Sequence, residues 1–134
     1  MAFVHDTTVR LYDTDAAGRL YFGALFRLVQ EALEELMARE GVPVGDVIAA
    51  GEFLYPVVHV EADYLAPLGV GDRVRVEVSP ARVGRRSFTL AYRVAFADGR
   101  EAASAKVVHA VVAAPSGAPA ALPGPLRELL ERLA

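Results

Sequence analysis

The chain has 134 residues, of which 54% are hydrophobic, and its formal net charge is -3 at pH 7. This length gives room for one well-buried core, so we expect a single domain over residues 1–134. The lack of a basic excess argues against a nucleic-acid partner, and the lack of cysteine excludes disulfides and thiolate metal sites.

The chain starts without a basic segment followed by an apolar run, and no stretch reaches the roughly 18 apolar residues needed to cross a bilayer. We therefore expect a cytoplasmic protein with no membrane contact. The apolar fraction is high for a small monomer, which indicates a further buried surface between subunits.

The first predicted elements are a strand and a long helix. The strand covers Ala2–Tyr12 and ends in the loop Asp13–Arg19. The helix is predicted from about Phe22 to Glu40, because apolar residues recur three and four positions apart and charged residues take the opposite side. Gly41 and the proline two residues later end it. We interpret the apolar stripe as core packing rather than as a cofactor site.

The rest of the chain favours strands. A short connector at 47–50 precedes four β runs, at Phe53–Leu65, Arg73–Val78, Ser87–Ala97 and Glu101–Ala114. Glycine and proline separate them, and Asp98-Gly99 predicts a tight hairpin. A short C-terminal helix is expected at about 125–133.

This order predicts an α+β protein in which a five-stranded antiparallel sheet carries one long helix on one face. A single helix covers only part of one face. We therefore expect the other face to take a partner.

Several blocks of sequence resemble one enzyme family. The stretch DTDAAGRLYF at 13–22 resembles the D-x-D-x-x-G-x-x-Y signature of hotdog-fold acyl-CoA thioesterases of the 4-hydroxybenzoyl-CoA thioesterase type. The blocks PVVHVEADY at 56–64, APL at 66–68, GD at 71–72 and GRRSFTL at 84–90 resemble the same family in order and spacing. The similarity covers roughly Val9–Val112, and the branch that hydrolyses 1,4-dihydroxy-2-naphthoyl-CoA in quinone biosynthesis looks most similar.

The resemblance implies a hotdog fold, in which the five-stranded antiparallel sheet wraps around the long helix. It also implies an acyl-CoA substrate, no separate cofactor because coenzyme A is part of the substrate, and a homodimer that assembles further as a dimer of dimers. The two aspartates then have different roles: Asp15 matches the catalytic carboxylate, as nucleophile or general base, while Asp13 braces the loop through backbone N–H groups.

The thioester oxygen needs hydrogen-bond donors, and a helix start offers unpaired backbone N–H groups. In the resemblance the backbone N–H of Phe22 polarises the carbonyl. Gly18 is expected to let the loop approach closely. The signature residue Tyr21 and Ser87 of the later block are assigned to substrate binding.

Other polar residues have less specific surroundings. His59 lies in an apolar run, where it is either a hydrogen-bonded core residue or a contact for substrate hydroxyls. Glu31 is expected on a solvated helix face or as a buried structural carboxylate. The three arginines Arg82, Arg85 and Arg86 sit around one predicted turn, where they are either solvated or hold the phosphates of coenzyme A. Three scattered histidines give no metal site.

Alternative functions come from neighbouring classes. A short- or medium-chain aliphatic acyl-CoA thioesterase would use the same groups. A hydratase on this fold would need a histidine a few residues after the aspartate, where Leu20 and Phe22 stand instead. A non-catalytic acyl-CoA-binding module would keep the pocket without the reactive acid.

Overall fold

The computed structural model describes residues 2–134. Its main sheet contains β1 (Phe3–Thr8), β3 (Val57–Tyr64), β4 (Arg73–Val83), β5 (Ser87–Phe96) and β6 (Glu101–Ala110). The remaining elements are the helices α1 (Ala24–Arg39), α2 (Val44–Ala50) and α3 (Gly124–Leu133), the 3-10 turn η1 (Leu11–Asp13), and the short strands β2 (Phe53–Leu54) and β7 (Val112–Ala113).

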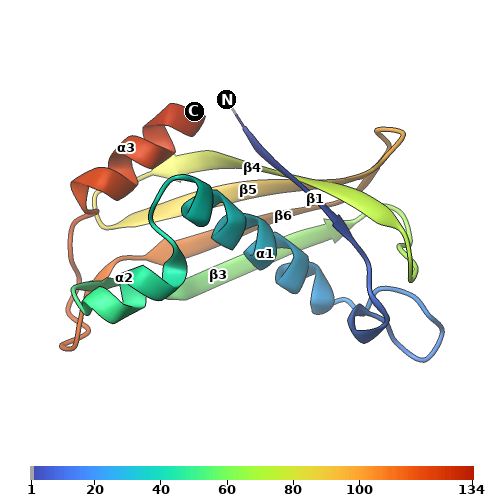
Figure 1. Ribbon diagram of the computed structural model, residues 1–134, viewed down its shortest axis with the longest axis horizontal. Helices are drawn as coiled ribbons and strands as arrows, with labels where there is room; N and C mark the ends of the chain where they lie inside the picture. The colour runs from blue at the N-terminus through green and yellow to red at the C-terminus, as the bar shows by residue number, and fades with distance from the viewer. Residues whose placement is uncertain (1) are drawn as a thin grey trace.

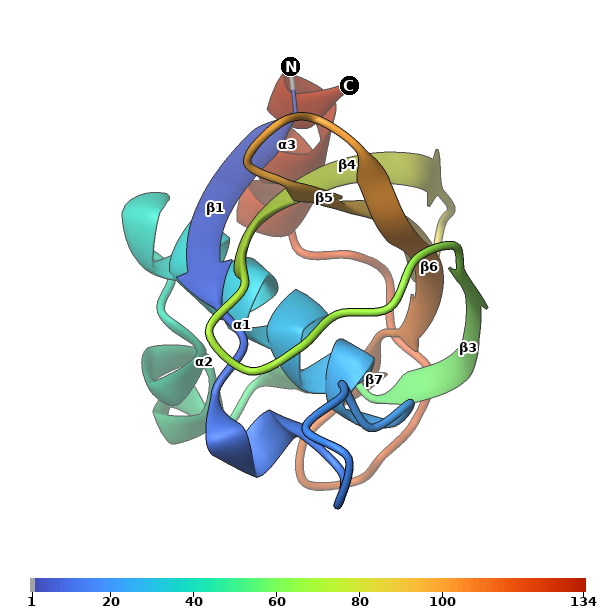
Figure 2. The same ribbon diagram turned by 90° about the vertical axis from the view of Figure 1, so that its right-hand side faces the viewer.

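The five long strands form one antiparallel sheet in the order β1-β4-β5-β6-β3. Consecutive hairpins join β4, β5 and β6, so that β1 and β3 are the edge strands. The sheet curves around α1 (Figure 1, Figure 2). The predicted α+β class and the hotdog arrangement are therefore confirmed.

Helix α1 packs into the concave face because one side of it is apolar. Its buried residues recur at helical spacing: Leu25, Leu28, Val29, Ala32, Leu33, Leu36 and Met37. On the strands that face the helix, alternate residues are buried, among them Val76 and Leu90, which are both fully buried. Each such aliphatic side chain contributes roughly 1.5–3 kcal/mol when buried, so this contact supplies much of the core.

The helix starts two residues later than predicted, at Ala24. A turn precedes it, in which the N–H of Ala24 donates to the carbonyl oxygen of Tyr21 (2.8 Å). The Tyr21 ring lies against Gly23, where an added Cβ would come within 2.9 Å of it. Phe22 therefore belongs to the turn and not to the helix.

The predicted first strand was too long. β1 ends at Thr8, and the chain turns through η1, where the N–H of Asp13 donates to the carbonyl oxygen of Arg10 (2.9 Å). The predicted run at 53–65 also divides, into β2 and β3, at Pro56, which has no N–H for a sheet hydrogen bond. β2 pairs with β7, which splits the predicted last strand in the same way.

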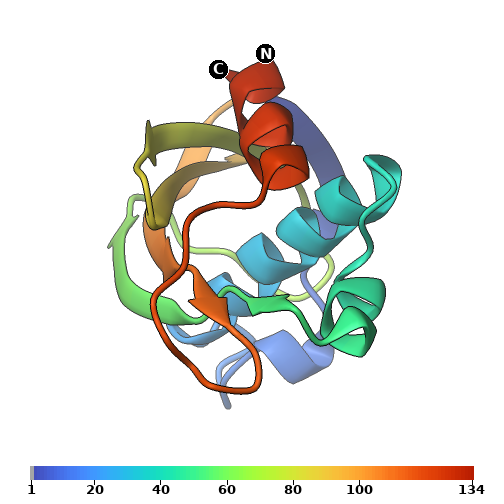
Figure 3. The same cartoon turned by 90° about the vertical axis from the view of Figure 1, so that its left-hand side faces the viewer.

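Helices α2 and α3 lie at the end of the sheet away from η1 (Figure 1, Figure 3). The predicted connector is helical over Val44–Ala50, and the predicted C-terminal helix begins at Gly124. No helix among residues 2–134 combines the length and apolar character needed to cross a bilayer.

The outer face of the sheet is polar. Ion pairs join Arg75 to Asp6 (2.9 Å) and Arg93 to Glu77 (3.5 Å) and Glu101 (3.6 Å). The expectation that this uncovered face takes a partner stays a prediction.

Exposed apolar side chains gather instead along the edge strand β3 and just after it: Val57, Val58, Val60, Tyr64 and Leu65. An edge strand also leaves backbone groups free to pair with another chain. The candidate surface for a partner is therefore this edge.

Candidate active site

The segment between η1 and α1 folds back as a small hairpin. The N–H of Asp15 donates to the carbonyl oxygen of Arg19 (2.8 Å), and the N–H of Tyr21 donates to that of Asp13 (2.9 Å). Two more backbone hydrogen bonds, between Leu20 and Leu68 and between Val70 and Gly18, tie it to the segment ahead of β4. The loop is thus held on two sides.

Asp15 lies exposed at the end of this hairpin. Its Oδ1 accepts hydrogen bonds from the backbone N–H groups of Ala17 (2.9 Å) and Arg19 (3.2 Å), which fixes the carboxylate on its turn. Its Oδ2 accepts no hydrogen bond from residues 2–134. One oxygen is thus oriented by the loop, while the other is available to a substrate or a water molecule.

Gly18 has a conformational role in the hairpin. A Cβ at this position would meet no atom of the described chain within 4 Å, and the expected close approach to a substrate stays a prediction. The backbone has a φ of +74°, in the left-handed region that side chains disfavour. The glycine is needed for the direction of the turn.

The turn before α1 presents unpaired backbone donors. Within the described part of the chain, neither Phe22 nor Gly23 donates its backbone N–H to an acceptor. The carbonyl oxygen of Phe22 accepts a hydrogen bond from the hydroxyl of Tyr64, on the edge strand β3. This contact orients the Phe22–Gly23 peptide, which follows the Tyr21–Phe22 peptide that carries the Phe22 N–H. The role of that N–H in polarising a carbonyl stays a prediction.

The side chains of Tyr21 and Phe22 are exposed and lie 4.6 Å apart between ring centroids. They form an aromatic surface beside the hairpin. Such a surface suits a flat acyl group.

Asp13 is fully buried and binds η1 to α1. Its Oδ2 accepts hydrogen bonds from the backbone N–H of Arg10 (2.9 Å) and from Nη2 of Arg27 (2.8 Å), and its Oδ1 pairs with Nε of Arg27. Burial raises the pKa of Asp13, but these hydrogen bonds lower it by more, so that the pKa lies below the ordinary 3.8. Asp13 braces the loop as predicted, whereas its partner Arg27 was not foreseen.

Glu31 extends this polar cluster toward β1. It pairs with Nη1 of Arg27 (3.2 Å) and accepts a hydrogen bond from the hydroxyl of Thr7 (3.2 Å). Nε2 of His5 lies 3.4 Å from Glu31 Oε1 without hydrogen-bond geometry. Of the two expected roles, solvated or structural, these contacts favour the structural one.

His59 is not a core residue in this chain. It is exposed on β3, with Nε2 3.7 Å from a carboxylate oxygen of the exposed Glu61. It precedes Tyr64, which touches the Phe22 turn, by five residues, or about 17 Å along an extended strand. The imidazole and the Asp15 hairpin therefore do not meet within one chain.

The arginines are further from Asp15. Arg82 belongs to β4, while Arg85 and Arg86 form the turn to β5, and all three are exposed. The backbone of the turn is anchored by hydrogen bonds from Leu122 N–H to the Arg85 carbonyl (3.1 Å) and from Val111 N–H to the Arg86 carbonyl (2.9 Å).

β4 begins beside the Asp15 hairpin and has 11 residues, which span about 35 Å. The arginine turn therefore lies at the opposite end of the sheet (Figure 1). Ser87 lies beside this turn, where its carbonyl oxygen accepts the Gly84 N–H (2.8 Å).

The structure thus brings together Asp15, Gly18, Tyr21 and Phe22, and leaves the other predicted residues elsewhere. No cluster of three or more potential metal ligands occurs among residues 2–134. Sequence reasoning missed Tyr64 and Arg27. Two signals in the sequence could have indicated them: Tyr64 ends the PVVHVEADY block, and Arg27 lies one helical turn ahead of Glu31.

Comparison with known proteins finds relatives that cover nearly the whole chain. A 1,4-dihydroxy-2-naphthoyl-CoA hydrolase from Nostoc punctiforme is 32% identical over 133 residues, which cover 98% of this chain and 88% of that protein. The crystal structure of a 1,4-dihydroxy-2-naphthoyl-CoA thioesterase from Synechocystis matches with a TM-score of 0.92 and 30% identity, covering 99% of this chain and 98% of that chain. A putative thioesterase from Prochlorococcus marinus matches with a TM-score of 0.89 and 29% identity, covering 98% and 95%.

A curved antiparallel sheet around one helix, with an acidic hairpin ahead of that helix, defines a hotdog-fold protein. Residues 9–133 match the family model of the thioesterase-like superfamily. The chain belongs to this family.

Proposed function

We propose that this protein is a thioesterase that hydrolyses an aromatic acyl-CoA such as 1,4-dihydroxy-2-naphthoyl-CoA or a 4-hydroxybenzoyl-CoA-like thioester. The observation that carries the proposal is the oriented carboxylate of Asp15 on the same hairpin as the unpaired N–H of Phe22. The names of the relatives, all at about one third identity, support the aromatic acyl group. With the naphthoyl substrate the reaction would be a step of menaquinone biosynthesis.

The chemistry follows from these two groups. Asp15 either attacks the thioester carbon or removes a proton from a water molecule that attacks it. The Phe22 N–H donates to the carbonyl oxygen as negative charge develops there. The C–S bond then breaks, coenzyme A leaves as the thiol, and the free aromatic acid remains after one water has been consumed.

The proposed substrate extends over more than one chain. The Asp15 hairpin and the arginine turn lie at opposite ends of the sheet, so one acyl-CoA can use both only if they come from different protomers. We accordingly propose a homodimer, assembled further into a tetramer. A cytoplasmic location stays a prediction.

The test is a hydrolysis assay with naphthoyl-, hydroxybenzoyl- and straight-chain acyl-CoAs. We expect the aromatic substrates to be preferred, and Asp15→Asn to lower kcat on the order of a hundredfold or more without loss of the fold. The exposed Asp46→Asn on α2 is the matched control and should keep normal turnover. Near-normal turnover of folded Asp15→Asn, or a preference for straight chains, would contradict the proposal.

A further inference from the structure

A cavity lies away from the Asp15 hairpin. It has a volume of ≈970 Å³ and is lined by the second half of α1, by α2, by the strands β2, β5, β6 and β7, and by α3. Its first residue on α1 is Gln30, six residues after the helix begins, or about 9 Å along the helix axis. No residue of the Asp13–Phe22 hairpin lines it. The cavity is therefore separate from the candidate active site.

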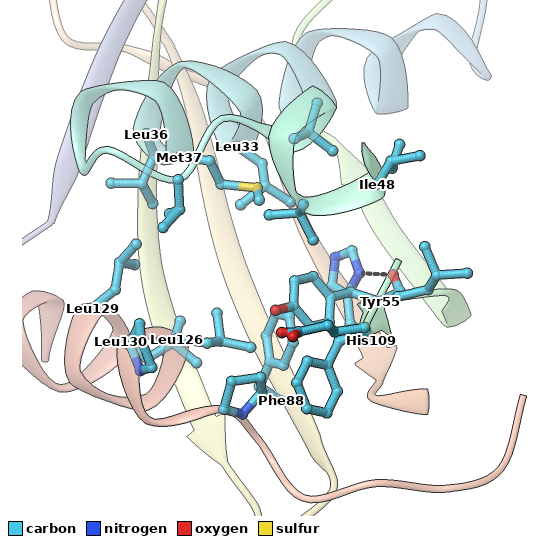
Figure 4. Close-up of a pocket in the computed structure, with 18 of the residues that line it drawn as sticks. Leu33, Leu36, Met37, Ile48, Tyr55, Phe88, His109, Leu126, Leu129 and Leu130 are labelled. Atoms are coloured by element: carbon cyan, nitrogen blue, oxygen red, sulfur yellow. Dashed lines mark hydrogen bonds between the residues drawn. The ribbon is translucent and has the colours of Figure 1, made fainter. Parts of the chain in front are cut away.

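The walls of the cavity differ in character. Leucines of α1 and α3 form one side, while Tyr55, Phe88 and His109 form an aromatic side (Figure 4). The rings of Phe88 and His109 are stacked, with centroids 4.9 Å apart and 9° between their planes, and the Tyr55 ring meets Phe88 edge-on. A flat aromatic ligand finds both stacking and edge contacts on such a wall.

One ring nitrogen of His109 has no hydrogen-bond partner. Its Nδ1 lies 2.9 Å from the carbonyl oxygen of Tyr55, which can only accept, so Nδ1 carries the proton. Nε2 is then an acceptor, and it is buried with no hydrogen bond in a residue that is only 4% exposed. Burial also lowers the pKa of His109 below 6.5, and the hydrogen bond to the Tyr55 carbonyl opposes this effect only in part. The lowered pKa keeps the ring neutral.

An unsatisfied acceptor of this kind is rare in a folded core. Figure 4 shows Nε2 on the side of the imidazole that faces the cavity, while Nδ1 is turned away toward the backbone of Tyr55. Nε2 has almost no accessible surface in this conformation, so the side chains of the wall have to shift before a hydrogen-bond donor in the cavity reaches it.

We infer that this cavity is a binding site for a flat aromatic molecule that carries a hydroxyl group, with the rings against Phe88 and Tyr55 and the hydroxyl donating to Nε2 of His109. The volume lies within the range of about 300–1,000 Å³ that is common for small-molecule pockets, so a two-ring compound has ample room. The site is distinct from the proposed thioesterase centre and does not depend on that activity.

The test uses 2-naphthol and its methyl ether, 2-methoxynaphthalene, which lacks the donor. Fluorescence titration should give 2-naphthol about fivefold tighter binding to the unaltered protein, the expected value of one hydrogen bond. In His109→Phe, which keeps a stacked ring but no acceptor, this preference should disappear. Equal affinity for the two compounds in the unaltered protein, or no binding of either, would overturn the inference.

A second measurement locates the binding site independently: the NMR chemical shifts of the side-chain nitrogens of the three histidines. 2-Naphthol should move the Nε2 signal of His109 and leave those of His5 and His59 unchanged, whereas binding at the Asp15 hairpin would leave His109 unmoved and reject the site. Val47→Phe, which fills the cavity from α2, should weaken binding at least about fivefold. Val4→Phe, on β1 outside the cavity, should not.

Discussion

At the scale of single residues, two aspartates two positions apart have opposite surroundings. Asp13 is fully buried against Arg27, whereas Asp15 is exposed at the end of a hairpin. A buried carboxylate cannot reach a substrate, and its loss leaves a charged partner and a backbone N–H unsatisfied. This difference in burial separates a structural acid from a candidate reactive one.

Asp13→Asn should therefore lower the free energy of unfolding by about 2 kcal/mol, because it removes a charged hydrogen-bond network that is partly shielded from water. Urea unfolding followed by circular dichroism measures the loss. The exposed Asp46→Asn, in the first turn of α2, should change stability by less than about 1 kcal/mol. A loss no larger in Asp13→Asn than in this control would contradict the structural role.

The same residue sets a dependence on acid. The pKa of Asp13 in the folded protein lies below 3.8, its value in an unfolded chain, so folding is favoured by the ionised form. This contribution is complete above pH 3.8 and is lost as the pH falls from there through the folded pKa. The unaltered protein should consequently lose stability more steeply below pH 3.8 than Asp13→Asn, as unfolding curves over that range would show.

At the scale of elements, the sequence predicted those features that depend only on neighbouring residues. The apolar periodicity of α1 and the hairpin signal between β5 and β6 are properties of neighbouring residues, and both were confirmed. η1 depends on the pairing of Asp13 with Arg27, and the Phe22 turn on Tyr64, 42 residues away. Contacts between distant residues leave no periodic trace in one sequence, so these features were missed.

The turn between β4 and β5 offers a test at the same scale. Its backbone is held by hydrogen bonds to the carbonyl groups of Arg85 and Arg86, which alanine preserves, so the double variant to alanine should fold normally. If the guanidinium groups hold coenzyme A phosphates, KM for acyl-CoA should rise with kcat nearly unchanged, because such contacts bind ground state and transition state alike. The rise should shrink at high ionic strength.

A matched control and a second substrate make this outcome specific. Arg100→Ala, at the exposed turn between β5 and β6, should leave KM unaltered. With the same acyl group on a short pantetheine-like thiol, the double variant and the unaltered protein should perform alike. Equal impairment on both substrates, or on neither, would remove the turn from the substrate site.

At the scale of the whole molecule, the two edges of the sheet are unlike. The exposed side chains of β3 include Val57, Val58 and Val60, 50%, 60% and 44% exposed, whereas those of β1 are Val4 and Asp6, of which Asp6 pairs with Arg75. Long apolar edges are rarely left open in native proteins. Pairing of two β3 edges would cover these valines and bring a second chain to Tyr64 and the Phe22 turn.

A charge on that edge should therefore separate the protomers. Val58→Lys places an ammonium group where the apolar edge would be buried, and we expect a folded monomer by sedimentation velocity, with thioesterase activity lost because the site lacks its second chain. Val4→Lys, a similar exposed valine on the opposite edge strand β1, should keep both the oligomer and the activity. Circular dichroism distinguishes dissociation from unfolding. A stable and active monomer of the unaltered protein at micromolar concentration would exclude the shared site, and Asp15 would then have to act within a single chain.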